Sequence, residues 1–370
     1  MTAASPPTVH LTGPVRVDAE HVEPQAWVVG GRLTFTRPAG SAAARVTIDG
    51  WVLPGLVDAH CHVGLGPAGE VDRATTRAQA EADRDTGVLL IRDAGSPADT
   101  RWIDAAEDLP RLVRAGRHVA RTRRYLRHVG EEIEPDRLVA EVRRQARRGD
   151  GWVKLVGDWI DRERGDLAPC WPDDALAEAV AAAHAEGARV TAHCFATESL
   201  PGLLDAGIDG VEHGTGFTED LAARAAAAGV AVVPTLVQVD TFPALAAQGE
   251  ARFPVWAARM RRLHARRRET VEMLHARGVP IFAGTDAGSV LSHGRIAEEI
   301  AALADVLGAE AAVGSATWRA RRWLGRPGLA EGAPADLVVL PADPLADVAA
   351  LTAPVAVVLR GRVVAGGRPG

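Results

Sequence analysis

The middle of the chain repeats one pattern, in which apolar residues at helical spacing end at a glycine and a short apolar run follows. The clearest copy begins at Pro172, which suits the first position of a helix, and continues with Leu176 and Val180 on one helical face. Gly187 then suits the end of the helix, and Ala188–His193 has the apolar character of a strand. This segment is therefore predicted to be a helix followed by a strand.

Counting such apolar runs along the chain gives eight predicted strands. They are Leu56–His60, Val88–Arg92, His118–Arg123, Trp152–Val156, Ala188–His193, Ile208–His213, Val230–Thr235 and Val279–Asp286. Continuous apolar strands that alternate with helices are typical of a parallel sheet covered on both faces, and eight such units predict a (β/α)8 TIM barrel. A doubly wound open sheet is the alternative, but no G-x-G-x-x-G follows the first strand.

The two ends of the chain have a different pattern of short, β-branched runs separated by Gly and Pro. Such runs lie at Ala26–Val29, Leu33–Thr36, Ala44–Ile48, Asp336–Leu340 and Val355–Leu359. Neither end is long enough for a sizeable core of its own. We therefore expect residues 1–54 and 327–370 to form one small β-sandwich domain, with residues 55–326 as the barrel inserted between them.

Composition narrows the class of protein. Apolar residues make up 47% of the 370 residues and charged residues 24%, and no apolar run approaches the ~18 residues of a membrane span. Three Cys and a start without a charged, apolar leader favour reduced thiols and a cytoplasmic location. A net charge of −6 gives no sign of nucleic-acid or membrane binding, so we expect a small-molecule substrate, with homo-oligomerisation left open.

Polar residues with metal-binding side chains stand at the ends of the predicted strands, where a TIM barrel has its active site. His60 and His62 close the first strand, and because strand side chains alternate, both imidazoles face the same way. His193, His213 and Asp286 end the fifth, sixth and eighth strands. Each alone has an ordinary structural explanation, but together they predict a site for a transition metal.

Lys154 ends the fourth predicted strand and is the single Lys among the 42 Lys and Arg residues. A charged Lys in an apolar strand is costly, whereas a neutral one can react with carbon dioxide to form a carbamate, which is an oxygen ligand able to bridge two metals. The alternative is a Lys that reaches solvent or pairs with Asp158. The spacing alone leaves both interpretations open.

Taken together, these motifs resemble those of the amidohydrolase superfamily. The resemblance spans almost the whole chain and rests on PGLVDAHCH, the strand-four Lys, TAH, EHGTG, GTDAG followed by His293-Gly294, and the late GAPADLVVL. The motifs are most similar to the imidazolonepropionase-related and Xaa-Pro dipeptidase-like branch. The resemblance implies that His60, His62 and Asp286 hold one metal and that His193 and His213 hold another. It also implies a carboxylated Lys154 between the two ions.

An amidohydrolase of this kind would cleave a C–N bond in a small amide, an Xaa-Pro-like dipeptide or a cyclic amide. The expected mechanism uses a metal-bridging hydroxide, with Asp286 as the proton shuttle to the leaving nitrogen. Zinc is the first expectation for the two divalent ions, with manganese, iron and cobalt as alternatives. The alternative functions are a mononuclear hydrolase or deaminase similar to imidazolonepropionase, and a metal-free barrel that serves as a scaffold.

The residues that contact the substrate are less well defined by the sequence. His128 follows the third predicted strand and resembles a substrate-binding His of dipeptidase-like relatives, and Tyr125 and His293 are further candidates. A loop or helix-capping role is the alternative for Tyr125 and His293. The nearby run of Arg123, Arg124 and Arg127 could bind a substrate carboxylate, although a solvated basic run would look the same.

Overall fold

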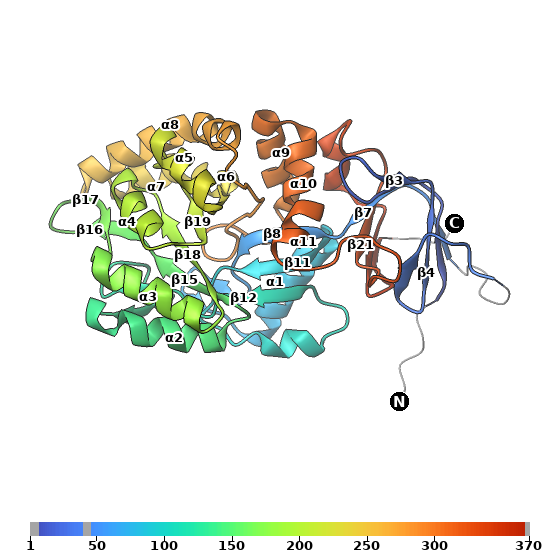
Figure 1. Cartoon of the computed structure of the whole chain (residues 1–370), viewed down its shortest axis with the longest axis horizontal. Helices are drawn as coiled ribbons and strands as arrows, with labels where there is room; N and C mark the ends of the chain where they lie inside the picture. Colours follow the sequence, from blue (N-terminus) through green and yellow to red (C-terminus); the bar gives the residue numbers. More distant parts are fainter. Residues whose placement is uncertain (1–6, 40–45, 367–370) are drawn as a thin grey trace.

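Parallel strands lie at the centre of the larger part of the molecule, with helices packed around them (Figure 1). The structure is a computed structural model, and it describes residues 7–39 and 46–366. One sheet contains β8 (Leu56–Cys61), β11 (Val88–Asp93) and β12 (Arg111–Arg114), all parallel. The order of the second sheet is β14-β13-β15-β18-β19-β20. Its strands are β14 (Glu131–Ile133), β13 (Val119–Arg121), β15 (Trp152–Val156), β18 (Arg189–Cys194), β19 (Gly210–His213) and β20 (Ala231–Val233).

The segment from Val279 to Ala287 connects these two sheets, although it is not a regular strand. The N–H of Phe282 donates to the carbonyl of Val232 (3.1 Å) on one side, and the N–H of Ala59 donates to the carbonyl of Ala283 (2.9 Å) on the other. Only isolated bridges form here, so the prediction of a strand over Val279–Asp286 is wrong. Pro280 lacks an N–H for a ladder, and Asp286 has a left-handed φ of 57°. The arrangement is a TIM-barrel-like α/β fold.

The third predicted strand also differs from expectation. The run predicted at His118–Arg123 contains the strand β13 only over Val119–Arg121, and a separate strand, β12, precedes it at Arg111–Arg114. Arg111 and Arg114 flank just two apolar residues of β12, which conceals its strand character in the sequence. Arg114 is nevertheless buried, because it forms ion pairs with Asp104 (2.7 Å) and Asp150 (2.8 Å).

The helices surround the two sheets. They are α1 (Arg73–Asp85), α2 (Leu138–Arg148), α3 (Asp173–Ala185), α4 (Leu200–Asp205), α5 (Glu219–Ala228), α6 (Leu236–Val239), α7 (Phe242–Gly249), α8 (Pro254–Ala276), α9 (Ile296–Leu307), α10 (Ala309–Ser315) and α11 (Trp318–Trp323). The predicted helix after Pro172 is confirmed as α3, with Pro172 as its N-cap. Gly187 adopts a φ of 75° after the helix, which a residue with a side chain rarely does. Within residues 7–39 and 46–366, no helix combines the length and apolar character needed to span a membrane.

Strands from the two ends of the chain pair with each other at one side of the molecule, blue and red in Figure 1. One sheet has the order β23-β22-β21-β7-β2-β3, and the other has the order β5-β4-β1-β6. The first comprises β23 (Arg362–Gly366), β22 (Ala356–Leu359), β21 (Leu337–Leu340), β7 (Trp51–Pro54), β2 (Val15–Arg16) and β3 (Val22–Glu23). The second comprises β5 (Arg32–Thr34), β4 (Ala26–Val29), β1 (Val9–Leu11) and β6 (Val46–Ile48). Residues 44 and 45 of the predicted run Ala44–Ile48 lie outside the described residues.

Candidate metal centre

Two imidazoles and one carboxylate meet at the carboxyl end of β8. The Nε2 atoms of His60 and His62 are 3.3 Å apart, and Asp286 Oδ1 lies 3.2 Å from the first and 2.8 Å from the second. Both His are buried and Asp286 is partly buried. These three residues offer ligand atoms that all lie within 4.8 Å of one another, so they could hold one metal ion.

The backbone around Asp286 explains how this residue, 224 positions after His62 in the sequence, reaches β8. Its N–H donates to the carbonyl of His60 at 2.6 Å. Two residues earlier, Gly284 approaches β8 so closely that a Cβ atom would stand 2.7 Å from the backbone nitrogen of His60. The glycine of the GTDAG sequence is therefore required for the close approach that brings Asp286 to the two imidazoles.

The opposite nitrogens of these imidazoles have partners that orient the rings. His62 Nδ1 lies 2.7 Å from the carbonyl oxygen of Gly95, to which it donates, and this leaves the lone pair on Nε2. His60 Nδ1 lies 2.7 Å from Glu212 Oε2, and His213 Nδ1 lies 2.7 Å from Thr235 Oγ1. Such partners fix the tautomer and the direction of a metal-binding imidazole.

Glu212 connects His60 to the buried guanidinium group of Arg92. Its Oε1 accepts a hydrogen bond from Arg92 Nη2 at 2.6 Å and another from the hydroxyl of Thr191. Burial raises the pKa of Glu212, but Arg92 and His60 outweigh it and hold the pKa well below its usual value. Glu212 is therefore an ionised carboxylate that positions the ring of His60.

His193 and His213 lie beside this cluster at the ends of β18 and β19. Their ring centroids are 4.8 Å apart, and those of His213 and His60 are 5.2 Å apart. Burial lowers the pKa of His213 to about 3 and that of His193 well below its usual value, so both rings are neutral and can donate a lone pair to a metal. His193 Nε2 is buried and makes no hydrogen bond among the described residues; its nearest charged partner, Asp158 Oδ1, lies 3.8 Å away.

The side chain of Lys154 lies in the same buried region of the molecule. It is 1% exposed, and burial lowers its pKa to about 8 despite the opposing effects of Glu212 and Asp286. A minor neutral fraction is therefore present near neutral pH, and the neutral amine is the form that reacts with carbon dioxide. The register pairs Lys154 with Thr191 on β18, two residues before His193.

A cavity of about 220 Å³ opens above His62, His193 and Asp286. Most of its remaining lining is apolar or aromatic, comprising Leu65, Tyr125, Leu126, Val129, Trp159, Ile160, Phe195, Leu245, Trp256 and Val290, with Gln238 and Ser289 as the polar exceptions. A few buried polar groups within mostly apolar walls are typical of a site for a small organic molecule.

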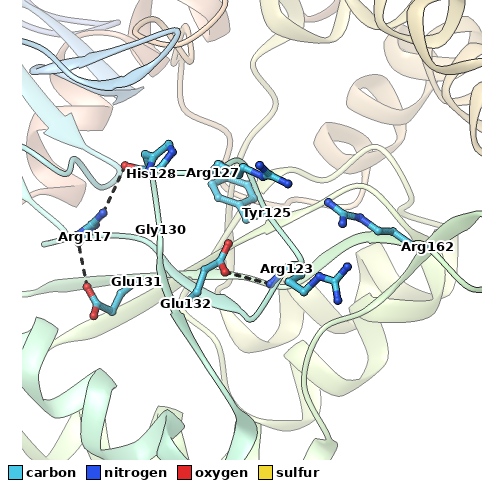
Figure 2. Close-up of a pocket in the computed structure, with 9 residues that line it drawn as sticks. All are labelled: Arg117, Arg123, Tyr125, Arg127, His128, Gly130, Glu131, Glu132 and Arg162. Atoms are coloured by element: carbon cyan, nitrogen blue, oxygen red, sulfur yellow. Dashed lines mark hydrogen bonds and ion pairs between the residues drawn. The ribbon is translucent and has the colours of Figure 1, made fainter.

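The three predicted substrate-binding residues have different positions. Tyr125 lines the cavity and lies 4.8 Å from Trp159, ring to ring. His128 is exposed and lines a separate outer pocket, to which Tyr125 also contributes (Figure 2). His293 lies in neither pocket, because its Nδ1 is held 2.7 Å from Asp83 Oδ2.

Sequence reasoning missed two residues of this interior. His118 is fully buried, and its ring lies 4.9 Å from that of His62 and 5.3 Å from that of Tyr125. Neither of its nitrogens has a hydrogen-bond partner among the residues described. Glu212 was the other, and its place immediately before His213 in the sixth strand was the available signal for a buried carboxylate.

One family profile and several known proteins are similar in sequence to this chain. The profile of the amidohydrolase family matches residues 51–364. A protein of Mycobacterium tuberculosis (strain ATCC 25618 / H37Rv), described as uncharacterized, is 54% identical over 91% of each chain. An adenine deaminase of Bradyrhizobium sp. (strain BTAi1 / ATCC BAA-1182) is 27% identical over 50% of this chain and 31% of its own length.

The overall fold also matches solved structures. The structure of a Xaa-Pro dipeptidase with methionine bound in its active site superposes with a TM-score of 0.81 at 21% identity, covering 96% of this chain and 99% of the other. Ochratoxinase of A. niger superposes with a TM-score of 0.77 at 18% identity, covering 98% and 96%.

Proposed function

The chain belongs to the amidohydrolase family and is a hydrolase of carbon–nitrogen bonds, and we propose that it works with a binuclear metal centre on a small amide, dipeptide or cyclic amide. His60, His62 and Asp286 would hold one divalent ion, and His193 and His213 would hold the second. Lys154, as a carbamate, would supply oxygen ligands to both. Zinc is the first candidate for both ions. The observation that carries this proposal is the convergence of two Nε2 atoms and one carboxylate oxygen within 3.3 Å.

The chemistry of the donor set supports a cation at this place. Two imidazole lone pairs and an ionised carboxylate point at one another, and a metal ion would satisfy all three. The unpartnered, buried Nε2 of His193 provides a free ligand atom for the second ion.

Different residues of the chain have different roles in hydrolysis. When bound, the two metal ions supply Lewis-acid polarisation of a carbonyl and a water of lowered pKa. Asp286 accepts the proton of the attacking water and passes it to the leaving nitrogen, as the new C–O bond forms and the C–N bond breaks. Glu212 and Arg92 hold His60 in place, and Gly95 does the same for His62. The apolar cavity walls limit the access of bulk water.

The proposed substrate class rests on the volume of the cavity and on the similarity of the fold to solved structures. The cavity of about 220 Å³ suits a small amide, and a Xaa-Pro dipeptidase is among the proteins of similar fold. The same family resemblance supports the finer description of the fold, in which residues 55–326 close into a (β/α)8 barrel and residues 1–54 and 327–370 form a β-sandwich.

A mononuclear hydrolase or deaminase is the second candidate. It is favoured by one observation on the described residues, namely that His60, His62 and Asp286 converge tightly whereas His193 and His213 do not join them within 4.8 Å. A deaminase would release ammonia from a purine or pyrimidine ring, and it would leave Lys154 without a catalytic task.

The experiment is a screen of dipeptides, N-acyl amino acids, cyclic amides and adenine against the metal-loaded chain, repeated after chelation and after metal is restored. We expect hydrolysis of at least one amide, its loss on chelation, and its recovery with zinc or manganese and bicarbonate. Release of ammonia from adenine, without amide hydrolysis, would support the second candidate. Hydrolysis that survives complete removal of metal would contradict both.

A further inference from the structure

We propose that Arg123, Arg127 and Arg162 form an anion-binding subsite next to the metal cavity, which holds a carboxylate carried by the substrate. The inference rests on the proposed function, because it names the class of amide that the cavity accepts. The three side chains come from two elements. Arg123 and Arg127 lie in the loop after β13, and Arg162 lies in the turn between β16 (Asp158–Asp161) and β17 (Asp166–Pro169).

The three guanidinium groups surround one open pocket of about 500 Å³. Figure 2 shows Arg123 and Arg127 on one side of this space and Arg162 reaching toward them from the other. The lining contains four Arg, counting Arg117, against Glu131 and Glu132. Two positive charges are therefore in excess, which favours a negatively charged ligand.

The acidic residues of the lining are already engaged, and the three guanidinium groups are not. Glu131 pairs with Arg117 (3.5 Å) and Arg144 (3.2 Å), and Glu132 accepts a hydrogen bond from the backbone N–H of Arg123 (3.2 Å). Within residues 7–39 and 46–366, the guanidinium groups of the three subsite arginines have neither a hydrogen bond nor an ion pair with the protein.

The basic run seen in the sequence therefore divides into two kinds of residue. Arg124 is a structural residue, since it pairs with Asp161 (3.1 Å) and donates to the carbonyls of Trp159 (3.0 Å) and Ala168 (2.8 Å). The guanidinium groups of Arg123 and Arg127 make no such contacts among the described residues. A merely solvated run would not explain why Arg162, from a different hairpin, joins these two around the same pocket.

The loop that carries Arg123 and Arg127 also forms the boundary with the cavity. Tyr125 lines both spaces, Leu126 and Val129 line the cavity, and Arg127 and His128 line the outer pocket. The loop turns sharply at its two ends, where Arg123 has a φ of 62° and His128 a φ of 66°. Left-handed conformations are unfavourable for a non-glycine residue, so the surrounding structure must hold this loop in place.

An apolar cavity beside a basic pocket fits a substrate of mixed character. Its apolar part would lie among Trp159, Phe195 and Trp256, and its carboxylate would lie between the guanidinium groups, which bind carboxylates in a bidentate manner. The class so defined is an acidic amide, such as an N-acyl amino acid or a dipeptide with a free carboxylate. Because the pocket is open to solvent, the attraction should weaken as salt increases.

The test is binding of two probes that contain no amide and so cannot be hydrolysed, 4-phenylbutyrate and 4-phenylbutanol. Binding to the metal-loaded chain is followed by the fluorescence of its Trp residues, of which Trp159 and Trp256 line the cavity. At low salt we expect the acid to bind roughly tenfold more tightly than the alcohol. The triple variant Arg123→Gln, Arg127→Gln, Arg162→Gln should lose this preference and still bind the alcohol as the unmodified chain does.

Arg322→Gln is the matched control, because Arg322 is exposed and has no side-chain partner among the described residues. It should retain the preference for the acid. The three single variants provide a second measurement if the triple variant folds poorly, and each should lose part of the preference. Equal binding of the two probes, or a preference that persists in a folded triple variant because the acid binds the metal, would overturn the proposal. A preference for the acid without any amide hydrolysis would instead contradict the proposed function alone.

Discussion

Two clusters of potential metal ligands lie next to each other along β8 and differ in how their polar atoms are satisfied. In the first, His60, His62 and Asp286 direct their ligand atoms at one another. In the second, Cys61, Asp83 and His293 are equally close in space. The distance between ligand atoms therefore does not distinguish the two clusters.

The hydrogen-bond partners do distinguish them. Asp83 accepts from His293 Nδ1 at 2.7 Å and from the N–H of Gly294 at 2.8 Å, so the carboxylate is satisfied without a cation. Burial and nearby carboxylates raise the pKa of the Cys61 thiol well above its usual value, which makes it a poor ligand. Among the nitrogen and oxygen atoms of this cluster, His293 Nε2 has no hydrogen-bond partner in the described part of the chain. We infer that the second cluster is a structural ion pair between α1 and the segment before α9, and that the first is the metal site.

The largest effect that separates the clusters is expected from Asp286→Asn. The amide cannot act as the proton shuttle and is a weaker metal ligand, so kcat should fall by about 10³-fold. The bound metal should also decrease, as measured by mass spectrometry of the desalted protein. Full activity and an unchanged metal content in this variant would contradict the assignment of Asp286.

The matched change in the second cluster is Asp83→Asn. Removing one partner of a buried ion pair should lower the free energy of unfolding by about 3 kcal/mol, measured by urea denaturation. The metal content of the folded protein should not change. A variant that loses metal and keeps its stability would show that the second cluster is the metal site.

A smaller effect is expected from Glu212→Gln, which tests the support behind the first cluster. The neutral side chain still fills the space but no longer provides a carboxylate for His60 Nδ1 and Arg92. Metal affinity should fall by about 10- to 100-fold, measured by competition with a chromophoric chelator. Thr76→Ser, a buried change in α1 away from the site, should leave the affinity unaltered.

The smallest expected effect is the pH dependence of the stability that the second cluster contributes. Burial lowers the pKa of His293, but Asp83 outweighs burial and raises it above its usual value of 6.5. The pair therefore contributes its full stability below about pH 6.5, and this contribution is lost as the pH rises through the raised pKa of the folded state. The stability difference between the unmodified chain and His293→Asn should thus shrink from pH 6 to pH 9. A difference that grows over this range would contradict the ion pair.

The sequence predicts the strand ends well because alternation and glycine positions are local properties. The residues His60, His62, His193 and His213 all lie at or next to the ends of the strands expected for them. The strand β12 was missed because Arg114 is buried only through ion pairs with Asp104 and Asp150, which no periodicity indicates. The other Arg of this strand, Arg111, is exposed.

Residues that act through partners distant in sequence were harder to predict. His293 pairs with Asp83, 210 positions away, so its neighbours in the sequence gave no sign that it lies outside the cavity. Arg162 joins the pocket of Arg123 only because the hairpin of β16 and β17 folds over the loop after β13. Such contacts depend on the tertiary fold, whereas the strand-end His residues depend mainly on local pattern.

The most direct test of the central claim is the number of metal ions bound per chain after reconstitution with zinc and bicarbonate, measured by inductively coupled plasma mass spectrometry. The proposed centre predicts two ions in the unmodified chain and one in Lys154→Arg, which keeps the positive charge but cannot form a carbamate. A single ion in the unmodified chain, or two ions that persist in Lys154→Arg, would contradict a lysine-bridged binuclear site.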